Sequence, residues 1–198
     1  MKFTISHHFL LIVGTLTNVL ANPIPSTHSP KRLLATRDLS AYTDGLATIT
    51  TDVNDLDARI LTYHGDDIAN ITTGAAALIT ALLAETKAIQ SYFLNATEAA
   101  TLLDPLETFA GRFTVVVEEY VGIHDAVAAA GEGWYLYSQL QEEHTAALTY
   151  TGNVVARIPA GDIKVAADAW ATNITDTLQA GVVAYKDIAV RPTELPRA

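Results

Sequence analysis

The stretch DLSAYTDGLATITTDVNDLDARILTY, residues 38–63, decides the fold. Its apolar residues recur in unbroken steps of three and four, and they are Leu39, Tyr42, Leu46, Ile49, Val53, Leu56, Ile60 and Tyr63. This heptad spacing places them all on one side of an α-helix, whereas a strand would need a step of two. Gly65 follows where a helix C-terminal cap is expected. The segment therefore predicts one long amphipathic helix.

The rest of the chain repeats this kind of pattern. A second helix is predicted over about 67–93, with an apolar stripe wide enough to face more than one neighbour. Further helices are predicted over roughly 134–157, which Pro159 ends, and from Asp162, as N-cap, to about Tyr185. With the helix described next, the pattern predicts an all-α fold, an elongated up-and-down bundle of about five amphipathic helices.

The third helix leaves two alternatives open. Asp104 and Pro105 are typical of an N-cap and a first helical position, which would leave a short helix over 97–103 before them. The other alternative is one continuous helix kinked at Pro105. Either way, a heptad seam follows through Leu106, Phe109, Phe113, Val116, Tyr120, Ile123 and Val127.

The first 37 residues differ from this body. Residues 1–21 have the three features of a secretory signal peptide, namely a positively charged N-terminal region, an apolar run and a small residue at the cleavage site. The apolar run is shorter than the ~20 residues that a membrane anchor needs. Residues 22–37 are predicted to be a flexible leader, in which Lys31-Arg32 is either a processing site that ends a propeptide at Arg32 or part of a solvated tail. The helical-bundle domain is then expected over 38–190.

Composition restricts the location and the partners. The C-terminal tail, 191–198, lacks the hydrophobic stretch of a GPI signal, so we expect a secreted, extracellular protein that is not tethered in that way.

The chain has 22 acidic and 12 basic residues, a formal net charge of −10. Nucleic-acid binding depends on Lys and Arg, so nucleic acid is not an expected partner. No transmembrane segment is expected, and the absence of cysteine excludes disulfides and thiolate metal sites.

Three N-glycosylation motifs occur, at Asn70, Asn95 and Asn173. They gain weight from the signal peptide, because a secreted chain passes the glycosylation machinery. Asn95 is the strongest candidate, since it falls in a predicted loop between helices. Asn70 and Asn173 lie on the shoulders of apolar stripes and would have to face water.

Catalytic and metal-binding motifs are missing. No nucleophile elbow, phosphate loop or zinc-protease motif occurs, so we expect no enzyme, no metal and no cofactor. The carboxylate-bridged metal site of helical bundles needs Glu three residues before His. Gln141 precedes His144 at that spacing. The run Glu142-Glu143-His144 is therefore interpreted as a solvated helix face.

The apolar seams themselves are the best candidate for a binding site. Large aromatic residues alternate there with glycines inside helices, such as Gly74, Gly111 and Gly181. Either the small residues allow close helix packing, or the interior is incompletely filled and holds a long hydrocarbon ligand. The candidate lining residues are Leu46, Ile49, Val53, Leu78, Leu82, Phe109, Phe113, Val116, Tyr120, Trp170, Ile174 and Leu178.

The chain resembles the fungal hydrophobic surface-binding protein A family, which includes cell-wall galactomannoproteins. The resemblance rests on the heptad first helix, on Leu140, on Val154-x-x-x-Ile158-Pro159, and on Leu178-x-x-Gly181-Val182-x-x-Tyr185. It implies an extracellular helical domain that adsorbs to hydrophobic surfaces or binds fatty acids in its interior. It carries over no catalytic residue. The chain departs from the anchored mannoproteins of the family, since it has one domain copy, no Ser/Thr-rich stalk and no GPI signal, so any cell-wall association is expected to be without a GPI anchor.

Two functions therefore remain open. The first is a secreted, non-catalytic binding protein for hydrophobic surfaces, a fatty acid or a similar lipid. The second is a secreted cell-wall or host-interaction glycoprotein that acts through its acidic exterior and has no internal ligand. A drug-sized apolar pocket between helices would favour the first, and a tightly filled interior the second.

Overall fold

The computed structural model describes residues 31–65 and 67–190, with side chains from residue 39 onward. This part of the chain is all helical, as predicted, and it contains no strand. It has seven helices rather than about five, because two short ones join the five long ones. The helices are α1 (Lys31–Leu61), α2 (Ala69–Ala88), α3 (Ala96–Thr101), α4 (Leu103–Gly122), α5 (His124–Ala130), α6 (Gly133–Ala156) and α7 (Asp162–Ala184).

The heptad seam of α1 packs as predicted. Every seam residue from Tyr42 to Tyr63 is buried, and Leu39 is partly buried against the same core. The helix begins at Lys31, before the predicted start at Asp38. Gly65 follows with φ near +90°, the left-handed region that glycine adopts without a steric penalty. The predicted signal peptide, most of the leader and the C-terminal tail lie outside the described residues.

Of the two alternatives for the third helix, the short helix followed by a separate long one is correct in outline, and the single kinked helix is wrong. The chain forms α3 and α4 as two helices, and the break falls at Leu102 rather than at Pro105. Pro105 lies within the first turn of α4, where its missing N–H group is not needed. A second break at Ile123 separates α4 from α5, although the apolar seam continues across it.

Both predicted aspartate caps are also wrong. Asp104 lies inside the first turn of α4, and the cap position belongs to Leu102. Asp162 is the first residue of α7, after Gly161. A carboxylate is favourable anywhere in the first turn, because the exposed N–H groups there carry partial positive charge. For α4 and α7, the sequence pattern therefore located the helix start to within two residues without identifying the cap.

Three apolar side chains that the sequence pattern placed on buried stripes are exposed instead, namely Leu83, Phe93 and Leu148. Helix α2 ends at Ala88, so Phe93 lies in the following loop and is 69% exposed. Leu148 on α6 is 54% exposed, since the buried stripe of that helix passes through Ala147 and Tyr150. These differences arise from the register of each helix against its neighbours.

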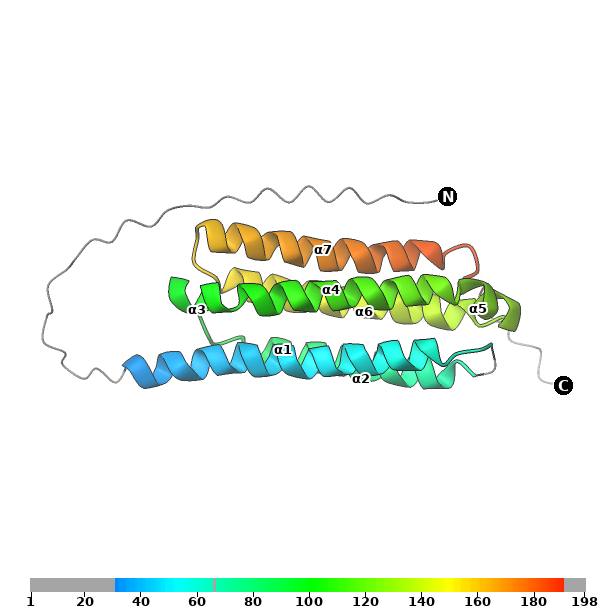
Figure 1. Ribbon diagram of the computed structural model, residues 1–198, viewed down its shortest axis with the longest axis horizontal. Helices are drawn as coiled ribbons and strands as arrows, with labels where there is room; N and C mark the ends of the chain where they lie inside the picture. The colour runs from blue at the N-terminus through cyan, green and yellow to red at the C-terminus, as the bar shows by residue number, and fades with distance from the viewer. Residues whose placement is uncertain (1–30, 66, 191–198) are drawn as a thin grey trace, which may run out of the picture. The chain divides into compact units, whose positions relative to one another are not determined.

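The five long helices form a closed ring. Each packs against two others, in the cyclic order α1, α2, α6, α7, α4 and back to α1. They alternate in direction along the chain, as Figure 1 shows. With helix axes spaced by about 9.5 Å, a regular ring of five places each axis about 8 Å from the centre, against about 6.7 Å in a ring of four. The interior, called the lumen below, is therefore wider than in a four-helix bundle.

Aromatic side chains fill this lumen. The largest fully buried side chains are Tyr42, Phe109, Phe113, Tyr120, Tyr150 and Tyr185. The rings of Phe109 and Phe113 meet edge to face, with centroids 5.0 Å apart. The ring of Phe109 on α4 also lies 6.2 Å from that of Tyr150 on α6. Because α4 and α6 are not neighbours in the ring, this contact crosses the lumen.

The helical glycines either allow close packing or lie on the surface, and none of the three lines an unfilled interior. A Cβ on Gly181 would lie 3.3 Å from Val117 Cγ1 and 3.4 Å from Leu140 Cδ2, so this glycine lets α7 approach α4 and α6 closely. Gly74 lies close to Arg59 in the same way. Gly111 has nothing within 4 Å of a Cβ built on it. Close packing thus accounts for Gly74 and Gly181, and Gly111 is on the exposed side of α4.

Candidate functional site

The predicted lining residues come together in the core. All but Trp170 are buried, and Trp170 is partly buried against the same cluster. The prediction drew residues from α1, α2, α4 and α7 and named none from α6. That helix contributes its own buried heptad stripe, which consists of Leu136, Leu140, Glu143, Ala147, Tyr150 and Val154.

The interpretation of Glu142-Glu143-His144 as a solvated face is wrong for its central residue. Glu142 is exposed and His144 is partly buried, but Glu143 has no exposed surface at all. A carboxylate at a core position breaks the apolar pattern that sequence analysis follows. Glu143 follows Leu140 by three residues and precedes Ala147 by four. This spacing could have placed Glu143 on the buried face of the helix.

Glu143 is held by a tyrosine from across the lumen. The Tyr120 hydroxyl donates to Glu143 Oε1 at 3.0 Å. Burial raises the pKa of the Glu143 carboxyl to about 8, although the Tyr120 hydrogen bond acts in the opposite direction. Burial also raises the pKa of Tyr120 well above its usual range, and the neighbouring Glu143 adds to this. At pH 7 the Glu143 carboxyl is therefore mainly protonated and neutral.

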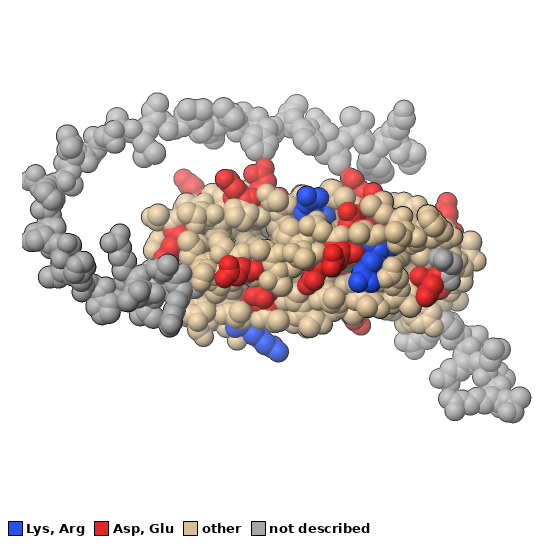
Figure 2. Space-filling view, turned by 60° about the horizontal axis from the view of Figure 1, so that its bottom comes forward, with Lys and Arg blue, Asp and Glu red and all other residues tan. Residues whose placement is uncertain are grey.

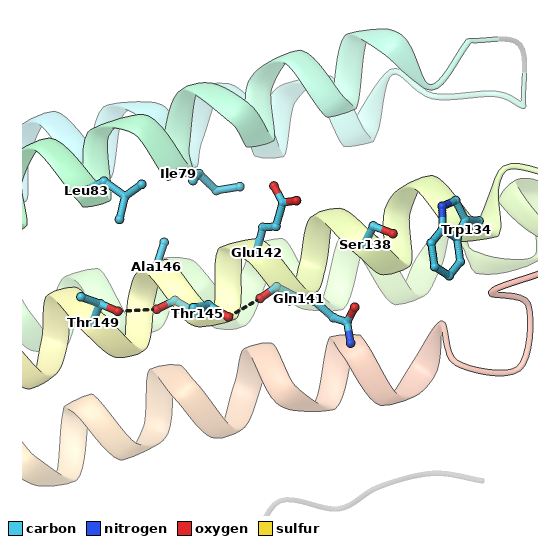
Figure 3. A pocket seen from close by; sticks show the side chains of 9 residues that line it. All are labelled: Ile79, Leu83, Trp134, Ser138, Gln141, Glu142, Thr145, Ala146 and Thr149. Carbon is cyan, nitrogen blue, oxygen red and sulfur yellow. Dashed lines mark hydrogen bonds between the residues drawn. The ribbon is translucent and has the colours of Figure 1, made fainter. Parts of the chain in front are cut away.

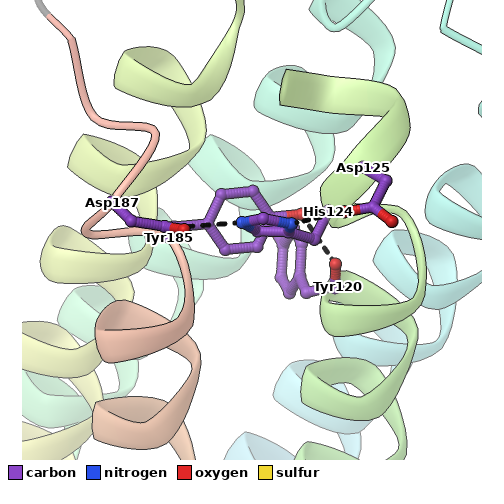
Figure 4. A network of polar contacts seen from close by, with 5 residues as sticks. All are labelled: Tyr120, His124, Asp125, Tyr185 and Asp187. Atoms are coloured by element: carbon purple, nitrogen blue, oxygen red, sulfur yellow. Dashed lines mark hydrogen bonds and ion pairs between the residues drawn. The ribbon is translucent and has the colours of Figure 1, made fainter. Parts of the chain in front are cut away.

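A second set of polar contacts joins the end of α7 to the junction of α4 and α5 (Figure 4). The Tyr185 hydroxyl donates to the Tyr120 backbone oxygen at 2.6 Å. The His124 ring packs edge to face on Tyr185, with centroids 5.3 Å apart. Its Nδ1 lies 3.0 Å from Asp125 and its Nε2 lies 3.3 Å from Asp187. These contacts secure one end of the ring beside the Tyr120–Glu143 pair.

A groove of about 540 Å³ runs between α2 and α6. Figure 3 shows Ile79 and Leu83 on α2 facing the α6 side chains. Ile79 and Ala146 belong to or pack against the core cluster, so core side chains form part of the groove floor. The remaining lining residues are Trp134, Ser138, Gln141, Glu142, Thr145 and Thr149. The volume lies in the range of small-molecule sites.

Sequence analysis did not find this groove. None of its lining residues is among the predicted ones, because the groove depends on how α2 and α6 are rotated against each other. Trp134 is the one aromatic residue among those that line the groove. The groove and the lumen residues thus form two adjacent parts of one candidate site, an outer recess and a packed interior.

All three glycosylation motifs have an exposed asparagine. Asn95 lies between α2 and α3, as predicted, and caps α3. Its Oδ1 accepts hydrogen bonds from the backbone N–H groups of Thr97 and Glu98, at 2.9 and 3.0 Å. The Asn95 backbone N–H in turn donates to the Glu98 side chain at 2.9 Å. A glycan would attach to Nδ2, a different atom from the capping oxygen.

The exterior is predominantly acidic. On the face in Figure 2, Asp and Glu side chains outnumber Lys and Arg and lie scattered over the surface. Among the residues that the structure describes, no group of three or more His, Cys, Asp or Glu could hold a metal ion. No helix in the same described part is long and apolar enough to span a membrane.

Comparison with known proteins identifies the family. The family model for hydrophobic surface binding protein A matches residues 39–156. The chain belongs to this family. It is 26% identical to cell wall mannoprotein 1 of Aspergillus flavus over 157 residues, which cover 79% of this chain and 57% of that protein. It is 25% identical to cell wall mannoprotein 1 of Aspergillus fumigatus over 181 residues, 91% of this chain and 60% of that protein. The chain thus spans about three fifths of the length of these two relatives.

Solved structures share its fold. Ligand binding domain 1 of Penicillium marneffei MP1 protein, complexed with arachidonic acids, superposes with a TM-score of 0.73 at 22% identity, over 76% of this chain and 99% of that domain. AFMP4P in complex with palmitic acid gives a TM-score of 0.67 at 18% identity, over 77% of this chain and 99% of that one. At these identities the likeness establishes the fold.

Proposed function

We propose that this family member is a secreted, non-catalytic binding protein that holds a fatty acid or a similar lipid between its helices and adsorbs to hydrophobic surfaces. The groove between α2 and α6 carries this proposal, because it offers about 540 Å³ beside an apolar core. The solved relatives with arachidonic and palmitic acid support it. The signal-peptide pattern and the cell-wall relatives support an extracellular location.

The ligand is proposed to enter at the groove and to place its tail among the predicted lumen residues. At the groove floor, Ala146 belongs to the core cluster and Ile79 packs against it, so the groove lies directly beside the core. Tails would contact Leu78 and Leu82 of α2 first, since these buried residues lie next to Ile79 and Leu83 along the helix. Aromatic side chains such as Phe113 would then move aside to admit the chain.

Displacement of a fluorescent fatty acid from the purified, secreted protein tests this function. Thr149→Trp fills the rim of the groove and should weaken binding at least tenfold. Thr51→Trp is the matched control, because both threonines are exposed and bond to the carbonyl four residues earlier on their helices. Thr51 lies on α1, outside the groove lining. If the wild type bound neither fatty acids nor fatty alcohols and did not adsorb to a hydrophobic surface, the proposal would be refuted.

The alternative is a wall or host glycoprotein that acts through its exterior. It is favoured by the acidic surface and by the exposure of Asn70, Asn95 and Asn173. Adsorption to an alkyl-coated sensor and binding to isolated wall polysaccharide separate the two functions. Binding to polysaccharide that depends on the glycans, together with no lipid binding, would support the alternative.

A further inference from the structure

Two polar atoms in the lumen lack partners. On the buried stripe of α6, Glu143 Oε2 and the Tyr150 hydroxyl have no hydrogen-bond partner among the described residues. The two side chains lie seven residues apart, hence on the same face of the helix and about 10.5 Å apart along its axis. Buried polar groups are normally paired, so an unpaired one requires an explanation.

Glu143 reaches the middle of the ring. Its bond to Tyr120 joins α6 to α4, which are not neighbours, so the bond crosses the lumen. One turn before Glu143, Leu140 meets Gly181 of α7, and Val117 of α4 meets the same glycine. The Tyr120–Glu143 pair is therefore located where α4, α6 and α7 converge. It is a polar position inside an otherwise apolar lumen.

Resting on the proposed function, we infer that Glu143 and Tyr120 bind the head group of a lipid in the lumen, and that this head is a neutral hydroxyl, as in a fatty alcohol. A hydroxyl both donates and accepts a hydrogen bond, so it can pair with Oε2 whether or not the carboxyl carries a proton. An ionised fatty acid can only accept a hydrogen bond, and it would bring an unpaired negative charge into an apolar site.

The surroundings of Glu143 support a neutral ligand. No Lys, Arg or His side chain is hydrogen-bonded or ion-paired to it among the described residues. The raised pKa of the carboxyl, about 8, agrees with a site that does not stabilise negative charge. A carboxylate head would then have to take up a proton or remain outside, towards the groove.

Head-group chemistry at fixed chain length tests the inference. Dodecanol, dodecanoate and dodecyl methyl ether are compared at pH 7 by displacement of the neutral dye Nile red from the full secreted chain. Dodecanol should bind at least tenfold more tightly than dodecanoate. The ether should bind more weakly than the alcohol, because it cannot donate. Equal affinities for the alcohol and the acid would overturn the inference.

Two variants connect the result to Glu143. Glu143→Gln keeps a donor and an acceptor but cannot ionise. At pH 9, where the wild-type carboxyl is ionised, it should therefore tighten dodecanoate binding and lower the ratio of the dodecanol affinity to the dodecanoate affinity. Glu118→Gln is the control, because Glu118 is exposed on α4 and lies outside the groove lining, and it should leave the ratio of the two affinities unchanged. If Glu143→Gln leaves the ratio of the dodecanol and dodecanoate affinities unchanged at pH 9, the head-group site is rejected and the proposed function stands. Failure of all three probes to bind would reject both.

Discussion

Glu143 makes the stability of the core depend on pH. Its carboxyl has a pKa of about 8 in the folded protein and 4.5 without the fold, so the folded state binds more protons between these values. The contribution of this residue to the free energy of unfolding is then greatest below pH 4.5 and is lost as pH rises to about 8. The slope approaches about 1.4 kcal/mol per pH unit for one proton. Urea unfolding between pH 5 and 8 measures it.

Glu143→Gln should remove this slope, because the amide does not titrate. Glu142→Gln, at an exposed position, should retain it. The comparison between variants is needed because the pKa of His124 is also raised by its contacts in the fold, so that residue adds a pH dependence of its own. A wild-type slope that persists unchanged in Glu143→Gln would show that another group causes it.

His124 should titrate above its ordinary range. The hydrogen bond to Asp125 is the main cause of its raised pKa, and Asp187 adds a smaller part, while partial burial acts against both. Proton NMR of the His124 ring should therefore give a pKa above 6.5. Asp125→Asn should lower that pKa more than Asp187→Asn does. The opposite order would mean that the contact between α7 and the α4–α5 junction dominates.

At the scale of elements, Asn95 combines a helix cap with a glycosylation motif. Asn95→Ala removes the acceptor of two backbone N–H groups of α3 and should destabilise the protein by about 1 kcal/mol. Asn95→Asp keeps a capping oxygen and destroys the motif. In protein secreted by a glycosylating host, both variants should lose the mass of one glycan, but only Asn95→Ala should lose stability to urea. Equal stability losses would assign the effect to the glycan.

The long helices could be predicted from sequence because each buried face is a run of apolar residues at regular steps. The seam of α1 is buried from Tyr42 onward, as its spacing indicated. The break at Ile123 could not be predicted, since Ile123 and Val127 continue the steps of the α4 seam without interruption. Breaks of this kind depend on what the helix end meets in the folded protein.

The candidate site was only partly predictable for a related reason. The lumen residues share one property, apolarity at core positions, and were identified by it. Glu143 lies at a core position of α6 but is charged or polar, so it is missed when buried faces are predicted from apolar residues alone. The groove arises between Ile79 of α2 and Ala146 of α6, whose distance is fixed by packing and not by either helix alone.

For the whole molecule, the ring of five helices explains why large side chains are needed in the core. A five-membered ring leaves a wide centre, and contacts across it, such as Phe109 with Tyr150, replace direct packing between the backbones of α4 and α6. Aromatic side chains of this kind can change rotamer to admit a chain of similar width. The same ring can therefore be filled by its own side chains or by a ligand.

Phe113→Ala tests this interchange. Removing a fully buried phenylalanine ring should destabilise the protein by about 3–5 kcal/mol and leave an apolar cavity in the lumen. A lipid tail that occupies the cavity should recover part of that loss, so dodecanol should raise the melting temperature of Phe113→Ala by more than it raises that of the wild type. Phe93→Ala is the matched control, because Phe93 is 69% exposed and the Arg157 guanidinium lies over its ring, 5.9 Å from the ring centre. It should change stability by about 1 kcal/mol at most and leave the ligand response unchanged. A destabilised Phe113→Ala with no greater response to dodecanol would place the lipid outside the lumen, in the groove alone.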